Sequence, residues 1–312
     1  MPNNSENEVG RAFEYVIVEE LSRVIGEKKI LLELTERAKL SNTRDKTHLS
    51  NLDNSLKENL KKGAKVFIDW VVQQGWLNGK SSVSLDRLPD AAGVEGDPTD
   101  IRLTLKDNHE NSEIRNISIK HHHSALKHPR LPRLPDQCGI KDKNLKKEFN
   151  DDMDKIWNEF LIKAKKLNPQ ATDFSELKEK DVEFINENIY KPLLNRVCEF
   201  LNEEANNPEN TKAFFSFLTG RFNFYTIKNE DDKVLIKYFL DIKQPKSFEI
   251  VYPYNSITTF LMRFDNGWDL SLRLHTASSS FIKNGKLNQS TKLDVHCINL
   301  DKVIKIEEIS KS

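Results

Sequence analysis

The sequence predicts a mixed α/β (α+β) fold, in which a mixed β-sheet core is flanked by helices, with a helical insertion and a β-rich C-terminal part. Three patterns lead to this prediction. Apolar residues recur at helical spacing in the N-terminal part and again in the middle of the chain. They alternate with polar residues on either side of residue 110, and an Asn-Gly pair joins two further runs near residue 266. Helical and alternating segments combined in this way are typical of a sheet covered by helices.

The N-terminal region is predicted to be helical from Gly10 to about Trp76, after a polar tail at residues 1–9. Two stripes of apolar residues, each with the spacing of one helix face, support this prediction. The first stripe consists of Phe13, Val16, Ile17, Leu21, Val24 and Ile25. The second consists of Leu60, Ala64, Phe67, Ile68, Val71 and Val72.

A β-rich stretch is predicted next, beginning with a short strand at Val83-Ser84-Leu85. Residues 100–106 and 115–120 then alternate polar and apolar side chains, which predicts two half-buried strands. The segment 107–113 between them is rich in Asp, Asn and Ser, which suit a turn. These segments together predict a β-hairpin.

The register of this hairpin is predicted from its apolar rows. Pairing the strands about residue 110 places Asp100 opposite Lys120. It also places Arg102 opposite Ser118, with both apolar rows on one face. A slip by one residue would scramble both faces, which favours this register. We therefore expect one polar edge to display Asp100, Ser118 and Lys120.

A segment without acidic residues, from Ile114 to Pro135, includes the second strand and continues beyond it. Its basic residues are Arg115, Lys120, Lys127, Arg130 and Arg133, with His121, His122, His123 and His128 among them. Three adjacent histidines on a strand alternate between faces, so they suit contacts to phosphate better than one zinc site. Prolines at 129, 132 and 135 keep the segment from forming one long helix. A solvated basic loop is the alternative interpretation.

Residues 141 to about 245 are predicted to be mostly helical, and the part after them is predicted to be β-rich. There, residues 257–265 and 268–275 flank Asn266-Gly267, a pair that suits a type I′ hairpin turn. Leu270, Leu272 and Leu274 would face one side of the second strand, and Ser271, Arg273 and His275 the other. The core candidates of the helical region are Trp157, Phe160, Leu161, Ile185, Leu193, Leu194, Val197 and Phe200.

The composition argues against several classes of protein. The 312 residues include 48 Lys and Arg and 48 Asp and Glu, so a polycation that coats nucleic acid is disfavoured, although a local basic groove is not. Cys138, Cys198 and Cys297 form no CxxC pair, which fits reduced thiols rather than a disulfide framework or a structural zinc site. The N-terminus lacks the features of a signal peptide, and no apolar run approaches the roughly 20 residues of a membrane span. We expect a soluble, intracellular (cytoplasmic) protein.

Asp100 and Lys120, followed by the basic segment, match what a metal-dependent nuclease requires. Mg²⁺ prefers oxygen ligands and needs only one or two carboxylates beside the substrate phosphate. A nearby Lys can orient or help deprotonate the attacking water. Asp97 and Asp90 compete with Asp100 as metal ligand, and we rank them in the order Asp100, Asp97, Asp90. The alternative is a surface hairpin with an ordinary exposed Asp and Lys.

Asp100 followed by Ser118-Ile119-Lys120 resembles the signature of the PD-(D/E)xK nuclease superfamily, in which an acid starts one strand and acid-x-Lys ends its neighbour. The sequence departs from the pattern at Ser118, where the second acid is usual. Members with Ser-x-Lys supply the missing carboxylate from a helix elsewhere. The resemblance therefore points to Glu14, which borders the first apolar stripe, with Glu20 as the next choice. The alternative is a boundary carboxylate that lies in solvent or pairs with Arg11.

The blocks GDPTDIRL (96–103), ISIKHHHSALKHPRLP (117–132) and RLHTASSS (273–280) resemble those of HaeIII-type restriction endonucleases. The resemblance implies a type II enzyme that uses Mg²⁺ to cut double-stranded DNA at GGCC. In this interpretation Asp100 and Glu14 would hold the metal, with Asp97 as the competing ligand. Lys120 would assist the attacking water, and Ser118 would be a local hydrogen-bonding group of the catalytic set. The DNA-binding candidates are His121, His123, Lys127, His128, Arg130, Arg133, Arg273 and His275, since basic side chains hold phosphates and read guanine edges.

This interpretation divides the chain into three consecutive regions. Residues 10–140 would form the nuclease core with the catalytic hairpin, residues 141–245 a helical region, and residues 246–308 a β-rich part that completes the core or reads DNA. Double-stranded DNA is the expected partner, no membrane is involved, and a homodimer is one alternative for the assembly. A DNA methyltransferase is expected as a genetic neighbour, because a restriction enzyme endangers a host that lacks one.

Two rival functions remain at this point. The first is a different PD-(D/E)xK nuclease that acts in repair, recombination or structure-specific cutting. The second is a non-catalytic DNA- or RNA-binding protein with a degraded nuclease core, which the serine at position 118 would suit. Digestion of a mapped plasmid separates these functions, because only a restriction enzyme gives discrete, sequence-defined fragments.

Overall fold

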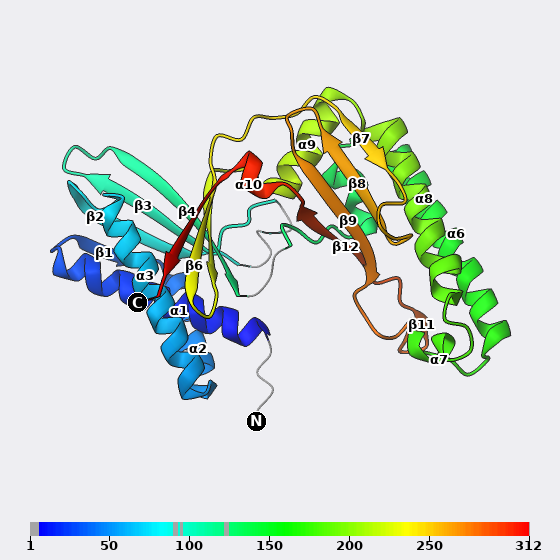
Figure 1. The fold of residues 1–312 in the computed structure, drawn as a ribbon, viewed down its shortest axis with the longest axis horizontal. Helices are drawn as coiled ribbons and strands as arrows, with labels where there is room; N and C mark the ends of the chain where they lie inside the picture. Colours follow the sequence, from blue (N-terminus) through cyan, green and yellow to red (C-terminus); the bar gives the residue numbers. More distant parts are fainter. Residues whose placement is uncertain (1–5, 90–92, 94–95, 122–124, 312) are drawn as a thin grey trace. The chain divides into compact units, whose positions relative to one another are not determined.

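The structure is a computed structural model that describes residues 6–89, 93, 96–121 and 125–311 and divides into two compact units (Figure 1). Unit 1 comprises Met1–Ser124, Gly220–Ile242 and Ile304–Ser312, and unit 2 comprises Ala125–Thr219 and Lys243–Val303. The units interleave along the chain, whereas the regions set out above follow one another. No helix within the described ranges is long and apolar enough to cross a membrane.

Unit 1 is built on a mixed, seven-stranded sheet in the order β1-β2-β3-β4-β5-β6-β13. β1 pairs in parallel with β2 and β4 in parallel with β5, while the other neighbours are antiparallel. The strands are β1 (Leu31–Leu34), β2 (Lys80–Arg87), β3 (Ile101–Asp107), β4 (Ser112–His121), β5 (Phe224–Asn229), β6 (Lys233–Phe239) and β13 (Lys305–Ser310). A mixed sheet flanked by helices confirms the predicted fold class.

Three helices pack against this sheet and against one another: α1 (Glu6–Glu27), α2 (Glu36–Asn51) and α3 (Asn54–Gln73). Both predicted apolar stripes lie in the shared core, where every member is buried except the partly buried Val72. Ile101, Leu103 and Leu105 on β3 are fully buried in the same core, while the residues between them are half-buried. The sheet therefore has one apolar face, and α1 and α3 contribute to the core against it.

The prediction of helix throughout residues 10–76 is wrong at β1. This four-residue strand pairs with β2, and α2 begins directly after Thr35, whose side chain accepts a hydrogen bond from the backbone of Ala38. Four residues are too few to show a period of their own between two helices. Strand β2 includes the predicted Val83–Leu85 segment but is longer at both ends.

The predicted hairpin is present as β3 and β4, but its register differs from the prediction by two residues. Ile101 lies opposite Ile117, so Asp100 lies across from Ser118 rather than Lys120. The turn causes this difference, because Asp107 accepts hydrogen bonds from the backbone amides of His109 and Asn111 and closes a loop shorter than expected. A shift of two residues preserves the alternation of side chains, so both predicted faces are retained.

The prediction of helix up to about residue 245 is wrong over residues 224–239, which form β5 and β6. Residues 224–227 are all buried, and a strand that is buried on both faces shows no alternation of polar and apolar residues. Its parallel partner, β4, lies far earlier in the chain, with most of the helices of unit 2 between them. No local pattern can reveal a pairing of that kind.

Unit 2 combines a four-stranded antiparallel sheet with helices. The sheet has the order β12-β9-β8-β7, with β7 (Phe248–Val251), β8 (Thr259–Phe264), β9 (Asp269–Thr276) and β12 (Thr291–Cys297). The principal helices are α6 (Lys143–Leu167), α7 (Phe174–Lys178), α8 (Lys191–Phe200) and α9 (Pro208–Thr219). All the predicted core residues of the helical region are buried except the partly buried Leu161.

The predicted C-terminal hairpin is confirmed as β8 and β9, with the three leucines at 270, 272 and 274 buried. Its turn is not type I′. That type requires a positive φ at both central residues, whereas of Asn266 and Gly267 only Gly267 has one, at 90°. Hydrogen bonds from Gly267 N to Phe264 O and from Phe264 N to Trp268 O close a three-residue loop instead.

Candidate active site

Asp100 stands immediately before β3 and is bound to β4 through both its backbone and its side chain. Its amide donates to the carbonyl oxygen of Ile117 at 2.9 Å. Carboxylate atom Oδ2 accepts from the backbone amide of Ile119 at 2.6 Å and from the hydroxyl of Ser118 at 3.3 Å. Ser118 is fully buried, so at this position the strand supplies a hydrogen bond instead of a second negative charge. Both of these hydrogen bonds fix Oδ2, and among the described residues Oδ1 accepts none.

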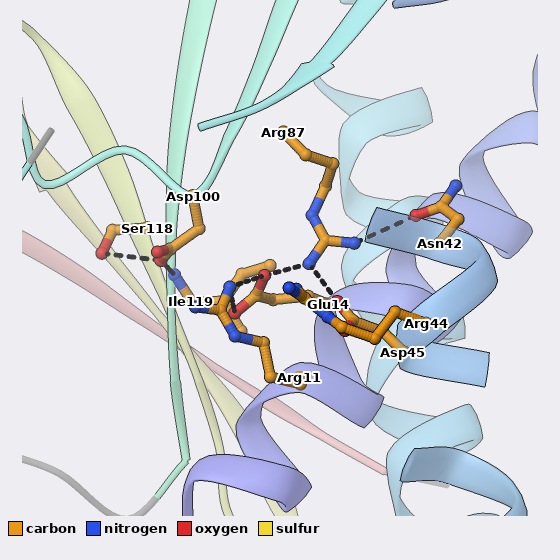
Figure 2. Close-up of polar contacts among 9 residues, drawn as sticks. All are labelled: Arg11, Glu14, Asn42, Arg44, Asp45, Arg87, Asp100, Ser118 and Ile119. Carbon is orange, nitrogen blue, oxygen red and sulfur yellow. Dashed lines mark hydrogen bonds and ion pairs between the residues drawn. The ribbon is translucent and has the colours of Figure 1, made fainter. Parts of the chain in front are cut away.

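Glu14 reaches the same place from α1, which packs against β4. Figure 2 shows Asp100 between Ser118 on one side and Glu14 on the other. Glu14 is 7% exposed. Burial, followed by the negative charge of Asp100, raises the pKa of Glu14 to about 7, although Arg87 and Arg11 act in the opposite direction. The structure therefore brings together the two carboxylates that the sequence places 86 positions apart.

Arg87, Asp45 and Asn42 extend this cluster, and the sequence-based reasoning missed all three. Arg87 lies at the end of β2 and is 2% exposed. Its Nη2 atom contacts Oε2 of Glu14 and lies 2.8 Å from Oδ2 of the fully buried Asp45, while Nη1 donates to Asn42 at 3.0 Å (Figure 2). The sequence did contain a signal for Arg87. Residues 83, 85 and 87 alternate onto the same buried face of β2, and an arginine on a buried face needs polar partners.

Lys120 lies near this cluster in sequence but takes no part in its bonds. It follows Ser118 by two positions, so strand alternation puts both on the same face of β4, opposite to Ile117 and Ile119 in the helix-covered core. In β5 its register partner is Lys228. Within the described part of the chain its side chain makes no hydrogen bond or ion pair, and its assistance to the attacking water stays a prediction.

The other acidic candidates are accounted for differently. Asp97 accepts a hydrogen bond from the backbone of Thr99 and pairs with Arg102 at 2.7 Å, contacts that shape the entry to β3. Its role as a metal ligand stays a prediction. Glu20 pairs with Arg23 at 2.6 Å, and this hydrogen bond lowers the pKa of Glu20. Asp90 lies outside the described residues.

Two of the predicted DNA-binding residues of the basic segment, Lys127 and Arg130, lie along β12 in unit 2. Lys127 bridges to Val295 and Arg130 to Lys292. Arg133 belongs to the short 3-10 turn Leu131–Arg133 and lies 3.5 Å from Asp136. His121 is the last residue of β4, and its side chain is not described. His122 and His123 lie outside the described residues.

Several of the DNA-binding candidates lie close to one carboxylate of unit 2. Asp294 on β12 lies 2.6 Å from Nδ1 of His128 and 2.8 Å from Nε2 of His275, and 3.8 Å from Lys292. Arg273 is its register partner on β9 and is exposed. Burial raises the pKa of Asp294, but His275 and His128 outweigh it, so the net shift is downward. The structure thus joins the basic segment to the C-terminal hairpin, a contact that the sequence did not predict.

The donor atoms near Asp100 fit Mg²⁺ better than a transition metal. Among the described residues no three His, Cys, Asp or Glu side chains form a ready-made metal cage. Mg²⁺ does not require one, since it is commonly held by one or two carboxylates together with substrate phosphate and water. Asp100 and Glu14 supply two carboxylates, each held by neighbouring groups mainly through one oxygen.

The comparison with protein families decides the assignment of the chain. A family model described as HaeIII restriction endonuclease matches residues 10–243, a span that includes Glu14, Asp100, Ser118 and Lys120. The chain belongs to the HaeIII restriction endonuclease family. The match confirms the resemblance seen in the first two sequence blocks, and the third block, from residue 273, lies beyond it.

A relative within the HaeIII family extends the similarity over the whole chain. The type II restriction enzyme HaeIII of Haemophilus aegyptius is 26% identical over 328 aligned positions, which cover 97% of each protein. Membership of the HaeIII family makes the chain a restriction endonuclease by family, and hence a nuclease with DNA as the implied substrate.

Proposed function

We propose that the protein is a type II restriction endonuclease that hydrolyses phosphodiester bonds of double-stranded DNA in the presence of Mg²⁺. The observation that carries the proposal is the approach of Glu14 to Asp100 at the start of β3, in a chain of the HaeIII family. Two acids from separate elements, buried together, form a site that suits a divalent cation and a phosphate. We infer a PD-(D/E)xK-type site, in which Glu14 replaces the acid usual at position 118.

Each residue of the site has a defined part in this proposal. Asp100 and Glu14 would hold the cation, and Ser118 would keep Asp100 in place through the bond to Oδ2. When bound, Mg²⁺ lowers the pKa of a coordinated water and offsets the charge that develops on the phosphate. Lys120 would orient the attacking water or stabilise that charge, once DNA lies along its face of β4.

Unit 2 would supply contacts to DNA. Arg273 is exposed on β9, Arg130 and Lys292 face each other across a β-bridge, and His128 and His275 converge on Asp294. Cations grouped in this way suit phosphates and the acceptor edges of guanine. The target GGCC rests on the family resemblance alone. An arrangement as a homodimer and a neighbouring methyltransferase gene are further parts of the proposal.

Digestion of a mapped plasmid tests the proposal. The wild-type protein with Mg²⁺ should give discrete fragments with ends at GGCC, and EDTA should abolish them. Glu14→Gln should cleave far more slowly, whereas Glu19→Gln, an exposed neighbour on the same helix, should cleave as the wild type does. Nicking confined to junctions or flaps would favour a repair nuclease, and DNA binding without cleavage would favour a degraded nuclease core.

A further inference from the structure

The buried guanidinium of Arg87 joins three elements of unit 1. It lies at the end of β2 and contacts Glu14 on α1 and both Asn42 and Asp45 on α2. Arg87 and Asp45 are 2% and 0% exposed. Charges are placed in such an environment only when partners compensate for the lost water. Asp45 also pairs with the exposed Arg44 at 2.8 Å, so Asp45 already has a cationic partner and the contact of Arg87 with Glu14 calls for an explanation.

The bonds of the Glu14 carboxylate are distributed unevenly between its oxygens. Oε2 receives Nη2 of Arg87 and lies 3.2 Å from Nη1 of Arg11. Among the described residues Oε1 has a single longer contact, 3.4 Å from the same atom of Arg11. The position of Oε2 is therefore fixed from the side of β2 and α2, by a group that is itself anchored by Asp45 and Asn42. Asp100 presents the same pattern, with both its side-chain bonds on Oδ2.

We propose that Arg87 is a positioning residue that holds the Glu14 carboxylate toward Asp100, with Asp45 as its anchor. The inference rests on the proposed function, because it concerns the carboxylates assigned to the cation. Groups that bond to a metal-ligating carboxylate orient it, and removing them weakens metal affinity or activity by roughly 10- to 100-fold. Arginine suits this part because its planar fork can bond to Glu14, Asp45 and Asn42 in fixed directions, which lysine cannot do.

The experiment must separate positioning from a structural role, since Arg87→Met alone leaves the buried Asp45 with the exposed Arg44 as its remaining ionic partner. The double variant Arg87→Met/Asp45→Asn removes both charges and keeps the shape of the cluster. Arg37→Met is the matched control, because Arg37 pairs with Asp86, the neighbour of Arg87 on β2, at the exposed surface. Thermal unfolding and metal-free DNA binding show which variants retain the fold.

Two readouts then test the proposal on the folded variants of the full chain. The first is binding of Mn²⁺ to the DNA-free protein, followed by the loss of the free-ion EPR signal. The second is the Mg²⁺ concentration that gives half-maximal plasmid cleavage. We expect the double variant to weaken both by roughly 10- to 100-fold, Arg37→Met to change neither, and Arg87→Lys to restore little. In a Glu14→Gln background the double variant should add no further loss.

Three results would overturn the inference. The first is wild-type affinity for Mn²⁺ in the double variant. The second is a further loss of Mn²⁺ affinity when the double variant is combined with Glu14→Gln. The third is Mn²⁺ binding by the wild type that Glu14→Gln leaves unchanged. Failure of the proposed function has a different signature. If the wild type cleaves no DNA but binds Mn²⁺ in a manner sensitive to both Glu14→Gln and the double variant, Arg87 positions Glu14 in a protein that is not a restriction enzyme.

Discussion

At the scale of single residues, Asp100 is the best-defined component of the site. Its backbone and its carboxylate are both bonded to β4, so its position depends on the sheet rather than on a loop. We expect Asp100→Asn to keep the backbone hydrogen bond to β4 and the approximate position of the side chain, while removing the charge that would hold the cation. Cleavage should fall by on the order of 10²–10³, the size of effect seen when one electrostatic contribution to a transition state is lost.

Single-turnover plasmid cleavage at saturating Mg²⁺ measures this effect, with Asp97→Asn as the companion variant. Asp97 is engaged with Thr99 and Arg102, so its loss should reduce stability more than the rate of cleavage. A larger loss of rate in Asp97→Asn than in Asp100→Asn would reverse the ranking of the two acids.

Lys120 offers a second prediction for a single residue. Since its side chain makes no ion pair or hydrogen bond within the part of the chain that the structure describes, Lys120→Ala should leave folding and metal-free DNA binding largely intact. It should abolish cleavage, because the ammonium would no longer assist the attacking water. Circular dichroism, gel-shift assays and plasmid digestion check the three parts, and cleavage at the wild-type rate would refute the assignment.

Asp294 predicts how the stability of unit 2 depends on pH. The imidazoles of His275 and His128 hold the pKa of Asp294 below its usual value, so the fold favours the carboxylate form. A group whose pKa is lowered by folding contributes stability above its unfolded pKa and loses it as the pH falls through the folded value. We expect this contribution to disappear below about pH 4, the ordinary range of an Asp carboxyl.

Urea unfolding between pH 3 and pH 7 tests this expectation. Asp294→Asn should have a flatter acid limb than the wild type, while Asp265→Asn, at the turn of the β8–β9 hairpin, serves as a control for a carboxylate outside the histidine cluster. Parallel acid limbs for wild type and Asp294→Asn would contradict the proposed interaction.

At the scale of elements, the fit of α3 against the end of β5 is tight. Gly63 of α3 lies so close to the buried Asn229 that a methyl group at this position would come within 2.0 Å of Oδ1 of that side chain. Asn229 cannot move freely, because its amide donates to Asn59 on α3 at 2.7 Å. Gly63→Ala should therefore lower the free energy of unfolding by about 1–3 kcal/mol, the usual cost of overpacking.

Chemical denaturation measures this cost, and a second substitution identifies its origin. Asn229→Ala should remove most of the penalty when combined with Gly63→Ala, because the methyl group would then meet no side chain. If the double variant is as unstable as the sum of the two single ones, the helix backbone rather than Asn229 causes the loss.

The helices and strands also show which structural features the sequence predicts. The apolar stripes of α1 and α3 and the alternation in β3 and β4 are local patterns, and they predicted these elements correctly. The hairpin register depends on the turn closed by Asp107, and the alternation of apolar residues does not predict the length of that turn. β5 was missed because its parallel partner is distant and both its faces are buried.

For the residues of the candidate site, too, local patterns were informative and contacts between distant segments were not visible in the sequence. The motif singled out Asp100 and the edge of a helix stripe singled out Glu14; the structure brings the two acids together, and their catalytic roles stay predictions. Arg87 was missed, because a buried arginine at the end of a strand has meaning only once its partners on α1 and α2 are known.

At the scale of the whole molecule, the interleaving of the units has an experimental consequence. The fragment of residues 1–124 contains Glu14, Asp100 and Lys120 but lacks β5, β6 and β13, so β4 would become an unpaired edge. Buried side chains of β4, such as Ile117, would then lose the partners that β5 provides. We expect this fragment to be unfolded or aggregated.

NMR spectra of the fragment, compared with those of the full chain, test this expectation. Adding a peptide of residues 220–242 supplies β5 and β6 and should increase the ordered fraction, whereas a scrambled peptide should not. A well-dispersed spectrum from the fragment alone would show that four strands and three helices suffice for folding.

The place of β13 has a bearing on the synthesis of the protein. This strand pairs with β6, and Glu307 on it accepts a hydrogen bond from the indole of Trp70 at 2.7 Å. On the ribosome, residues 305–310 emerge only after all of unit 2 has been translated. A premature stop codon anywhere in unit 2 would therefore also leave the sheet that carries Asp100 without its last strand. Incomplete translation products should therefore rarely be active nucleases, and under the proposed function this would limit cleavage of DNA by unfinished chains.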